Sequence, residues 1–332
     1  MIKVGILGAG RITNSHRQAY EELRADGVDV KIVAVADIRP EFTEKFRDTE
    51  RVYGDYKELL EAEKGQLDYV DICLPTFLHA PAAVMALDMG YNVLCEKPMA
   101  INAEAAQQMC DAAKRNDRLL MIAQSRRFRP ACDIIKDYID TEKLGKVKYA
   151  HLSNEGGTPD WSWEMWHYTE ERSGGALLDL LHDADLIQHF FGLPKAVTCV
   201  AHKNWPGSGY DRGTITYIYD NDVYVTSDID WTSQTFKLGA NTKTVVFENG
   251  YITYGPYDGK EEFFAVDKAG NETQLPKEGK SSYYREIKYY IECLTEHKPV
   301  SFCAPEESRN SVRMVMAACK SADGNGERVT LE

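Results

Sequence analysis

Residues 1–16 read MIKVGILGAGRITNSH, a short apolar run followed by a glycine-rich segment and the start of a helical pattern. Residues 2–7 suit a buried β-strand, and apolar residues recur at helical spacing over 11–25. Gly8 permits a tight turn, and Gly10 lets a pyrophosphate approach the backbone, where amides at a helix N-terminus bind the anion. The segment therefore predicts the first strand, turn and helix of a dinucleotide-binding sheet.

The choice of nucleotide depends on two positions after the second apolar run, 30–36. Asp37 can bind both ribose hydroxyls of NAD and repel a 2′-phosphate. Arg39 can either stack on adenine or accommodate the phosphate of NADP. The usual third glycine is Thr13 here, and an ordinary strand–helix turn has the same short pattern. We expect NAD, with NADP as the alternative, at a site that includes Gly8, Gly10, Arg11, Ile12, Asp37 and Arg39.

Short apolar runs alternate with helical patterns as far as residue 123. The expected strands are 2–7, 30–36, 68–74, 92–95 and 119–123. The expected helices are 11–25, 56–62, 79–89 and 102–116. Asn102 is a suitable N-cap for the last of these helices. Continuous apolar strands separated by helices indicate a parallel sheet covered on both faces, which is the doubly wound α/β arrangement.

After residue 125 the pattern changes to strands with a few helices. The expected strands are 146–152, 214–219, 223–229, 243–247 and 251–254. The dipeptides 221–222 (Asn-Asp) and 249–250 (Asn-Gly) suit hairpin turns. The expected helices are 130–140, 176–191, 281–296 and 306–321. The sequence thus predicts an α/β domain over 1–124 and an α+β domain over 125–332 with a largely antiparallel, open sheet.

The composition disfavours several classes of protein. Hydrophobic residues make up 43% of the chain, which is enough for a sizeable core. The 52 acidic residues outnumber the 39 basic ones, so nucleic acid or an anionic membrane is not expected as main partner. We expect neither a signal peptide nor a membrane span. The eight cysteines form no C-x-x-C pair, so we expect reduced thiols, no metal site and a cytoplasmic protein.

A second candidate for chemistry is the segment 95–98, Cys-Glu-Lys-Pro, which follows a buried strand. Its position is the carboxyl edge of the predicted sheet, where such folds bind ligands. Lys97 would be desolvated there beside the positive nicotinamide, and both influences favour the uncharged amine, which can accept a proton. The spacing alone is equally compatible with a surface lysine after a strand.

Several segments taken together resemble the Gfo/Idh/MocA oxidoreductases. In chain order they are 8–16 (GAGRITNSH), 75–87 (PTFLHAPAAVMAL), 96–98 (EKP), 126–128 (RRF), 144–147 (LGKV) and 173–191 (SGGALLDLLHDADLIQHFF). The resemblance covers nearly the whole chain and implies a Rossmann domain followed by a sheet domain whose open face forms dimers or tetramers. It also implies a tightly held NAD or NADP and oxidation or reduction of a ring carbon of a sugar or inositol.

The resemblance assigns catalytic roles to residues of both domains. His182 would take or give the hydroxyl proton, and Lys97 would orient and polarise that oxygen. Asp179 would accompany His182, although many members space this pair as D-x-x-x-H and the present chain has D-x-x-H. Both spacings place two side chains on one face of a helix. A histidine in a helix interface is the alternative for His182, and Asp183 and Asp185 are alternative partners for it.

Members of the family contact the nicotinamide ribose with residues that follow a strand. Pro75, Thr76 and His79 occupy that position here, and Glu96 lies beside Lys97. His79 can equally cap its helix.

Four further residues are candidates for contact with the substrate. Trp166 and His167 belong to an aromatic loop whose rings suit the apolar side of a sugar, or alternatively pack between domains. Arg127 either lies near the substrate or forms a structural salt bridge. Tyr283, at the start of the penultimate helix, is the fourth candidate.

We therefore expect reversible hydride transfer between NAD and an alcohol carbon. The same fold and cofactor also allow elimination or glycoside cleavage through a transient ketone, without net redox change. A non-enzymatic NAD-bound sensor is the third alternative, and the presence of both Lys97 and His182 counts against it.

Overall fold

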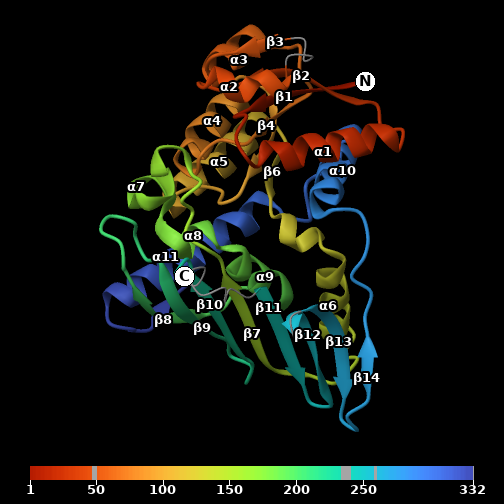
Figure 1. Ribbon diagram of the computed structural model, residues 1–332, viewed down its shortest axis with the longest axis vertical. Helices are drawn as coiled ribbons and strands as arrows, with labels where there is room; N and C mark the ends of the chain where they lie inside the picture. The colour runs from red at the N-terminus through yellow and green to blue at the C-terminus, as the bar shows by residue number, and fades with distance from the viewer. Residues whose placement is uncertain (47–50, 233–240, 258–259, 332) are drawn as a thin grey trace. The chain divides into compact units, whose positions relative to one another are not determined.

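The computed structural model describes residues 1–46, 51–232, 241–257 and 260–331 (Figure 1). The chain forms two compact units. Unit 1 consists of Met1–Ser125 and Lys280–Arg309, and unit 2 consists of Arg126–Gly279 and Asn310–Glu332. Unit 1 thus combines the N-terminal part of the chain with a segment close to its C-terminus. The domain bounds 1–124 and 125–332 stay a prediction, because compactness alone does not establish independent folding.

Unit 1 is built on a parallel sheet with the strand order β3-β2-β1-β4-β5-β6. Its strands are β1 (Ile2–Leu7), β2 (Val30–Ala36), β3 (Arg51–Tyr53), β4 (Tyr69–Ile72), β5 (Asn92–Glu96) and β6 (Leu120–Ala123). All of its pairings are parallel. The strand order reverses between β1 and β4, and ligands bind at the carboxyl ends of strands at such a point. The predicted doubly wound sheet is confirmed.

Helices flank this sheet and bury the strands. They are α1 (Thr13–Ala25), α2 (Pro40–Thr43), η1 (Glu44–Phe46), α3 (Tyr56–Ala62), α4 (Thr76–Asp88), α5 (Ala103–Asn116) and α10 (Ser282–Thr295). The side chain of Asn102 accepts the amide hydrogen of Ala105, which confirms the predicted N-cap. Helix α10 lies against α1, where the Tyr284 hydroxyl donates to Asp26 at 2.8 Å.

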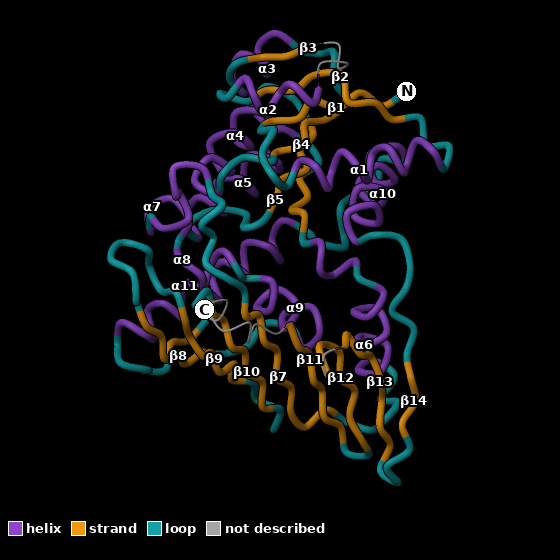
Figure 2. Tube along the Cα trace, viewed as in Figure 1, coloured by secondary structure: helices purple, strands orange, loops and turns teal. Residues whose placement is uncertain are grey.

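Unit 2 is built on a nine-stranded sheet, most of which is visible in Figure 2. Its strand order is β14-β13-β12-β11-β7-β10-β9-β8-β15. The strands are β7 (Val147–Glu155), β8 (Ala196–His202), β9 (Arg212–Ile218), β10 (Tyr224–Asp230), β11 (Asn241–Phe247), β12 (Gly250–Tyr257), β13 (Lys260–Asp267), β14 (Glu272–Gln274) and β15 (Val329–Thr330). Strands β7 and β10 pair in parallel and the other pairs are antiparallel, which confirms a largely antiparallel sheet. Both predicted hairpin turns connect antiparallel neighbours.

The remaining helices correct one prediction. They are η2 (Ser125–Phe128), α6 (Pro130–Asp140), η3 (Trp163–Tyr168), α7 (Glu170–Ser173), α8 (Gly175–Asp179), α9 (His182–Phe191) and α11 (Pro305–Asp323). A continuous helix over 176–191 is wrong, because α8 ends before α9 begins. The amide of Leu181 donates to Leu178 three residues back, at 3.1 Å, and this tighter turn ends α8. In the described part of the chain, no helix combines the length and apolar character that crossing a membrane requires.

Candidate functional site

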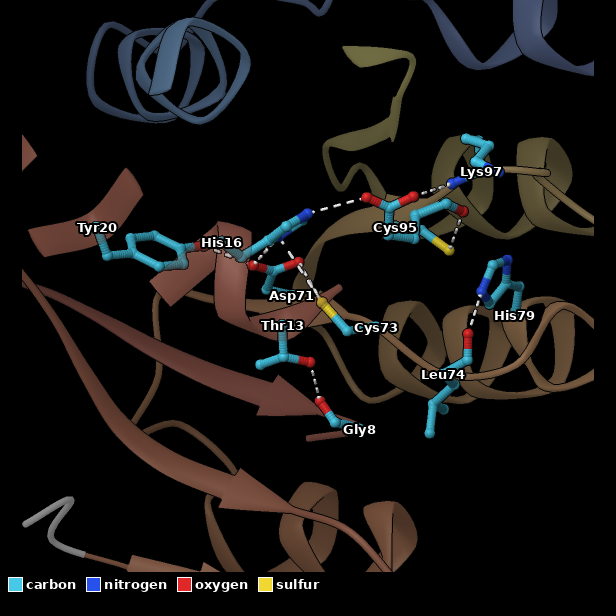
Figure 3. A network of polar contacts seen from close by, with 11 residues as sticks. Gly8, Thr13, His16, Tyr20, Asp71, Cys73, Leu74, His79, Cys95 and Lys97 are labelled. Atoms are coloured by element: carbon cyan, nitrogen blue, oxygen red, sulfur yellow. Dashed lines mark hydrogen bonds and ion pairs between the residues drawn. The ribbon is translucent and has the colours of Figure 1, made fainter. Parts of the chain in front are cut away.

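The glycine turn after β1 leaves open space at the start of α1. Gly8 has φ +96°, and a Cβ atom there would lie 2.6 Å from the carbonyl oxygen of Cys73, so the turn requires glycine. A Cβ on Gly10 would meet only the Arg39 guanidinium, at 3.9 Å. Thr13, in place of the third glycine, is buried and donates its hydroxyl to the Gly8 carbonyl at 2.8 Å (Figure 3). The open backbone at Gly10 beside a 13-residue helix fits a pyrophosphate.

Asp37 and Arg39 lie together at the carboxyl end of β2. The Asp37 carboxylate accepts hydrogen bonds from the Ala9 amide at 2.8 Å and from the Arg39 side chain at 3.1 Å. The Arg39 guanidinium also lies 3.8 Å from the centroid of the Phe42 ring. The carboxylate thus fixes both the glycine turn and the arginine. Arg11 is exposed and Ile12 is partly buried at the N-cap of α1.

Lys45 is a residue of this site that the sequence analysis missed. Its ammonium donates to the Gly10 carbonyl at 3.3 Å and to the Asn14 side chain at 2.6 Å. Burial lowers the pKa of Lys45. Nothing in the sequence pattern marks this lysine, because its position depends on how the short elements after β2 fold back onto the glycine turn. The structure therefore adds a cation to the predicted anion site.

The segment Glu96–Lys97 leaves the sheet at the carboxyl end of β5. Glu96 is buried and accepts the Lys97 amide hydrogen at 3.0 Å, whereas Lys97 is half-buried. His79 is buried with Nδ1 2.7 Å from the Pro98 carbonyl and Nε2 2.7 Å from the Leu74 carbonyl. Burial lowers the pKa of His79, and a neutral ring donates to only one of these oxygens. His79 thus links the end of β4 to the segment that carries Lys97.

Pro75 and Thr76 lie where the chain enters α4. Pro75 is the N-cap residue and Thr76, the first residue of the helix, is buried. The helix makes no side-chain cap hydrogen bond, so His79 does not act as its cap. Contact of Pro75, Thr76 and His79 with a cofactor stays a prediction.

Glu96 belongs to a cluster of buried ionisable groups in unit 1. We call this cluster, which consists of His16, Asp71, Glu96 and Glu286, the His16 cluster. The His16 ring lies between the carboxylates of Asp71 and Glu96. Burial alone lowers the pKa of His16, but Asp71 and Cys73 together outweigh it, so the pKa lies well above its usual value. Tyr283, a predicted substrate residue, packs its ring 5.7 Å from the His16 ring.

In unit 2 the structure brings three predicted residues together. His167 Nε2 lies 3.8 Å from the Asp179 carboxylate, and the His167 and Trp166 rings have centroids 3.6 Å apart. His167 is buried, and Trp166 is partly buried. His182 is half-buried and begins α9, so Asp179 and His182 lie on separate helices and not on one helical face. A substrate-binding role for this group stays a prediction.

The two alternative acids near His182 both contact arginines. Arg127 is 1% exposed and forms a bidentate salt bridge with Asp185, in which Nε and one terminal guanidinium nitrogen lie 2.7 and 2.8 Å from the two carboxylate oxygens. The Ser311 hydroxyl also donates to Asp185, at 3.1 Å. This geometry favours the structural alternative for Arg127 over contact with substrate. Asp183 is buried and lies 3.5 Å from Arg126.

Lys243 is a buried lysine that interacts electrostatically with Asp183 and Arg126, and we call these three residues the Lys243 cluster. Lys243 is 1% exposed, and its ammonium has no hydrogen-bond partner among the described residues. Burial lowers the pKa of Lys243 to about 8, although the Asp183 carboxylate opposes the shift. Burial also raises the pKa of Asp183. The sequence analysis did not single out Lys243, because it lies between two threonines at the start of the predicted strand 243–247.

Two family models match this chain. The model described as an oxidoreductase family with an NAD-binding Rossmann fold matches residues 2–124. The model described as the GFO/IDH/MocA C-terminal domain matches residues 133–253. Together they cover more than half of the chain, in the order that the resemblance implies.

Characterised relatives include dehydrogenases of sugars and inositol. The D-glucoside 3-dehydrogenase of Escherichia coli (strain K12) is 30% identical over 208 residues, which are 60% of this chain and 57% of the relative. The inositol 2-dehydrogenase of Rhizobium meliloti (strain 1021) is 27% identical over 265 residues, 79% of this chain and 72% of the relative. The chain thus spans less than two thirds of the length of the first of these relatives.

A solved structure agrees with the fold. The WlbA dehydrogenase from Bordetella pertussis, solved in complex with NADH and UDP-GlcNAcA, has a TM-score of 0.83 and 19% sequence identity. The match covers 100% of this chain and 99% of that one. At this identity the likeness concerns the fold.

Proposed function

The chain belongs to the Gfo/Idh/MocA family of NAD-binding oxidoreductases, and on that premise we propose that it is a dehydrogenase of a sugar, an inositol or a related polyol. In this proposal it moves a hydride between NAD and a hydroxyl-bearing carbon. The relatives that act on a glucoside and on inositol support this substrate class. The observation that carries the proposal is the open glycine turn at Gly10 in one unit with Lys97 at the end of β5.

The residues around the glycine turn would hold the cofactor. The amides at the start of α1 and the ammonium of Lys45 would bind the pyrophosphate. Asp37 would accept the ribose hydroxyls, and its salt bridge with Arg39 supports NAD over NADP, because the arginine is already paired with a carboxylate. When bound, NAD accepts or supplies the hydride.

Two residues would handle the proton of the reacting hydroxyl. His182 would take or give this proton, and the Lys97 side chain would orient and polarise the oxygen. Asp179 lies beside His167, so we assign this pair to the substrate pocket along with Trp166. Assembly as a homodimer or homotetramer and a cytoplasmic location stay predictions.

The test is absorbance at 340 nm with NAD⁺ or NADP⁺ against a panel of sugars, inositols and sugar acids. We expect NADH formation with at least one polyol, and a loss of about 100-fold or more in kcat for Lys97→Ala, because a positioned group at the reacting oxygen is removed. Lys114→Ala, an exposed lysine on α5, is the matched control and should keep wild-type rates.

Two outcomes would contradict the proposal. Tight NAD binding without NADH formation, but with conversion of a glycoside, would indicate a redox-neutral reaction through a transient ketone. NAD binding without turnover of any compound in the panel would favour a sensor.

A further inference from the structure

A chain of hydrogen bonds runs through unit 1 from Asp71 to Lys97. His16 Nδ1 lies 2.8 Å from an Asp71 oxygen, and His16 Nε2 lies 2.9 Å from Glu96 Oε1. The other Glu96 oxygen accepts the Lys97 amide hydrogen at 3.0 Å. Figure 3 shows the His16 ring beside Asp71 and Cys73. Ionised carboxylates only accept hydrogen bonds, so the ring must donate from both nitrogens, and only an imidazolium can do so.

With His16 protonated and all three carboxylates ionised, the His16 cluster would carry an excess of two buried negative charges, and a further proton would reduce that excess to one. His16, Asp71 and Glu286 are fully buried, and Glu96 is 5% exposed. Three carboxylates around one imidazolium would leave an excess of buried negative charge, which is costly. Neither oxygen of Glu286 has a hydrogen-bond partner among the described residues, although one oxygen lies within 4.8 Å of His16 and Glu96. Burial raises the pKa of Glu286 well above its usual value, which makes it the group that keeps the proton.

The spacing of His16, Glu96 and Glu286 is also compatible with a metal ion. A metal ligand needs a free lone pair on a ring nitrogen. Both nitrogens of His16 are occupied by hydrogen bonds to Asp71 and Glu96, so the ring has none to offer. The compensating positive charge is therefore a proton.

Neutral donors surround the Asp71 end of the cluster. The Tyr20 hydroxyl donates to Asp71 at 2.9 Å and accepts from the Tyr69 hydroxyl at 2.8 Å. The Cys73 sulfur lies 3.7 Å from His16 Nδ1. Burial raises the pKa of Cys73 to about 12 and that of Tyr20 well above its usual value, so both keep their protons at neutral pH. Asp71 is thus held as a carboxylate that anchors the ring of His16.

We propose that His16 is a positioning residue for Lys97. As an imidazolium between Asp71 and Glu96, it fixes the Glu96 carboxylate, which in turn holds the backbone amide of Lys97, while Glu286 remains a neutral acid. This role rests on the proposed function, because it matters for catalysis only if Lys97 acts on the substrate. The structural part of the proposal can be tested without any activity.

The first test is amide hydrogen exchange in the full-length chain, followed by NMR. In His16→Asn we expect the Lys97 amide to exchange at least about ten times faster than in wild type, because Glu96 is no longer fixed. His297→Asn is the matched control, since His297 is exposed and has φ +54°, which asparagine tolerates. An unchanged exchange rate at Lys97 in a folded His16→Asn protein would overturn the proposal.

The second test is a double-mutant cycle on the rate of NADH formation. His16→Asn should lower kcat about 10- to 100-fold and leave KM for NAD within about three-fold, because the lysine is misplaced and the nucleotide site is intact. Added to Glu96→Gln, the same change should cause little further loss, since His16 acts through Glu96. Full additivity of the two losses would contradict a role through Glu96.

The third test needs no variant, and so holds even if His16→Asn fails to fold. The ¹⁵N NMR spectrum of the wild-type histidines should show both nitrogens of His16 protonated at pH 8, and the purified protein should contain no stoichiometric metal. A singly protonated ring or one equivalent of bound metal would overturn the proposal. If these results hold but no polyol is oxidised, the proposed function fails and the positioning of Lys97 by His16 stands.

Discussion

The buried cluster of unit 1 contains more acidic than basic groups, whereas that of unit 2 contains more basic than acidic groups. The His16 cluster has three carboxylates and one imidazole, whereas the Lys243 cluster has one carboxylate facing a lysine and an arginine. Burial raises the pKa of Glu286 and lowers that of Lys243, whereas the pKa of His16 is raised in spite of its burial, by Asp71 and Cys73. Burial thus favours the uncharged form of Glu286 and of Lys243, and a neighbouring carboxylate favours the charged form of His16.

This difference gives the two clusters opposite responses to pH. A group with a higher pKa in the folded chain stabilises the fold fully below its unfolded pKa, and this stabilisation is lost as the pH rises through the folded value. His16 and Glu286 are of this kind. Lys243 has a lower pKa in the folded chain, so the unfolded chain binds more protons between about pH 8 and 10.5, and stability rises with pH across that window.

Unlike either cluster, the buried pair Arg127–Asp185 has one acidic and one basic group. Its disruption should cause the largest decrease in the free energy of unfolding. Arg127→Met leaves Asp185 as a buried, uncompensated anion and should lower the free energy of unfolding by about 3–5 kcal/mol. Urea denaturation followed by tryptophan fluorescence measures the change. Combining Arg127→Met with Asp185→Leu should restore most of the loss. Arg115→Met, in the exposed Arg115–Asp88 pair, is the control and should have little effect.

The protein should become more stable when Lys243 is replaced by an apolar residue. Lys243→Met should raise the free energy of unfolding at pH 6.5 by about 2 kcal/mol, because a thioether replaces an ammonium that has lost its hydration. Asp183 keeps Arg126 at 3.5 Å as its partner. The increase in stability that we expect for the wild type from pH 8 to 10 should be absent in this variant. A Lys243→Met protein that is less stable than the wild type at every pH would contradict the prediction that the buried ammonium is destabilising. Lys148→Met, on the exposed part of β7, is the matched control.

The His16 cluster should show the opposite pH dependence. Glu286→Gln should raise the free energy of unfolding by several kcal/mol at pH 8 and leave it unchanged at pH 4, because the amide needs no proton to stay neutral. Urea denaturation at the two pH values measures the difference. Glu292→Gln, an exposed residue of the same helix, should show no such dependence. A larger gain at pH 4 than at pH 8 would contradict a protonated Glu286.

The sequence predicted most of the fold because each unit repeats a simple pattern. Strand 30–36 and helices 56–62 and 130–140 have the predicted bounds, since apolar periodicity and turn residues coincide at their ends. The break at Leu180–Leu181 could not be predicted in this way. Apolar residues continue across it at helical spacing, and the tighter turn at Leu181 is a property of the packed backbone.

The partners of the buried ionisable groups could not be predicted from the sequence. His16 fell on the buried face of a predicted helix, and Asp71 stands inside an apolar strand, so both were visible as polar residues in an apolar pattern. Lys243 lies between two threonines at the start of a predicted strand and was not visible in this way. Their partners were not visible, because Glu286 follows His16 by 270 positions and only the fold brings them together. Lys45 had no local signal at all. A charged residue at a core position therefore indicates that a partner exists, but not which residue it is.

Unit 1 combines two segments of the chain that are synthesised at different times. Its sheet is complete once residue 123 has been synthesised, yet α10, which covers α1 and supplies Glu286, emerges from the ribosome more than 150 residues later. Until then the nascent chain lacks the helix that packs against α1. A fragment that ends at residue 125 would lack this helix permanently, and we expect it to depend on chaperones or to aggregate where the full chain does not.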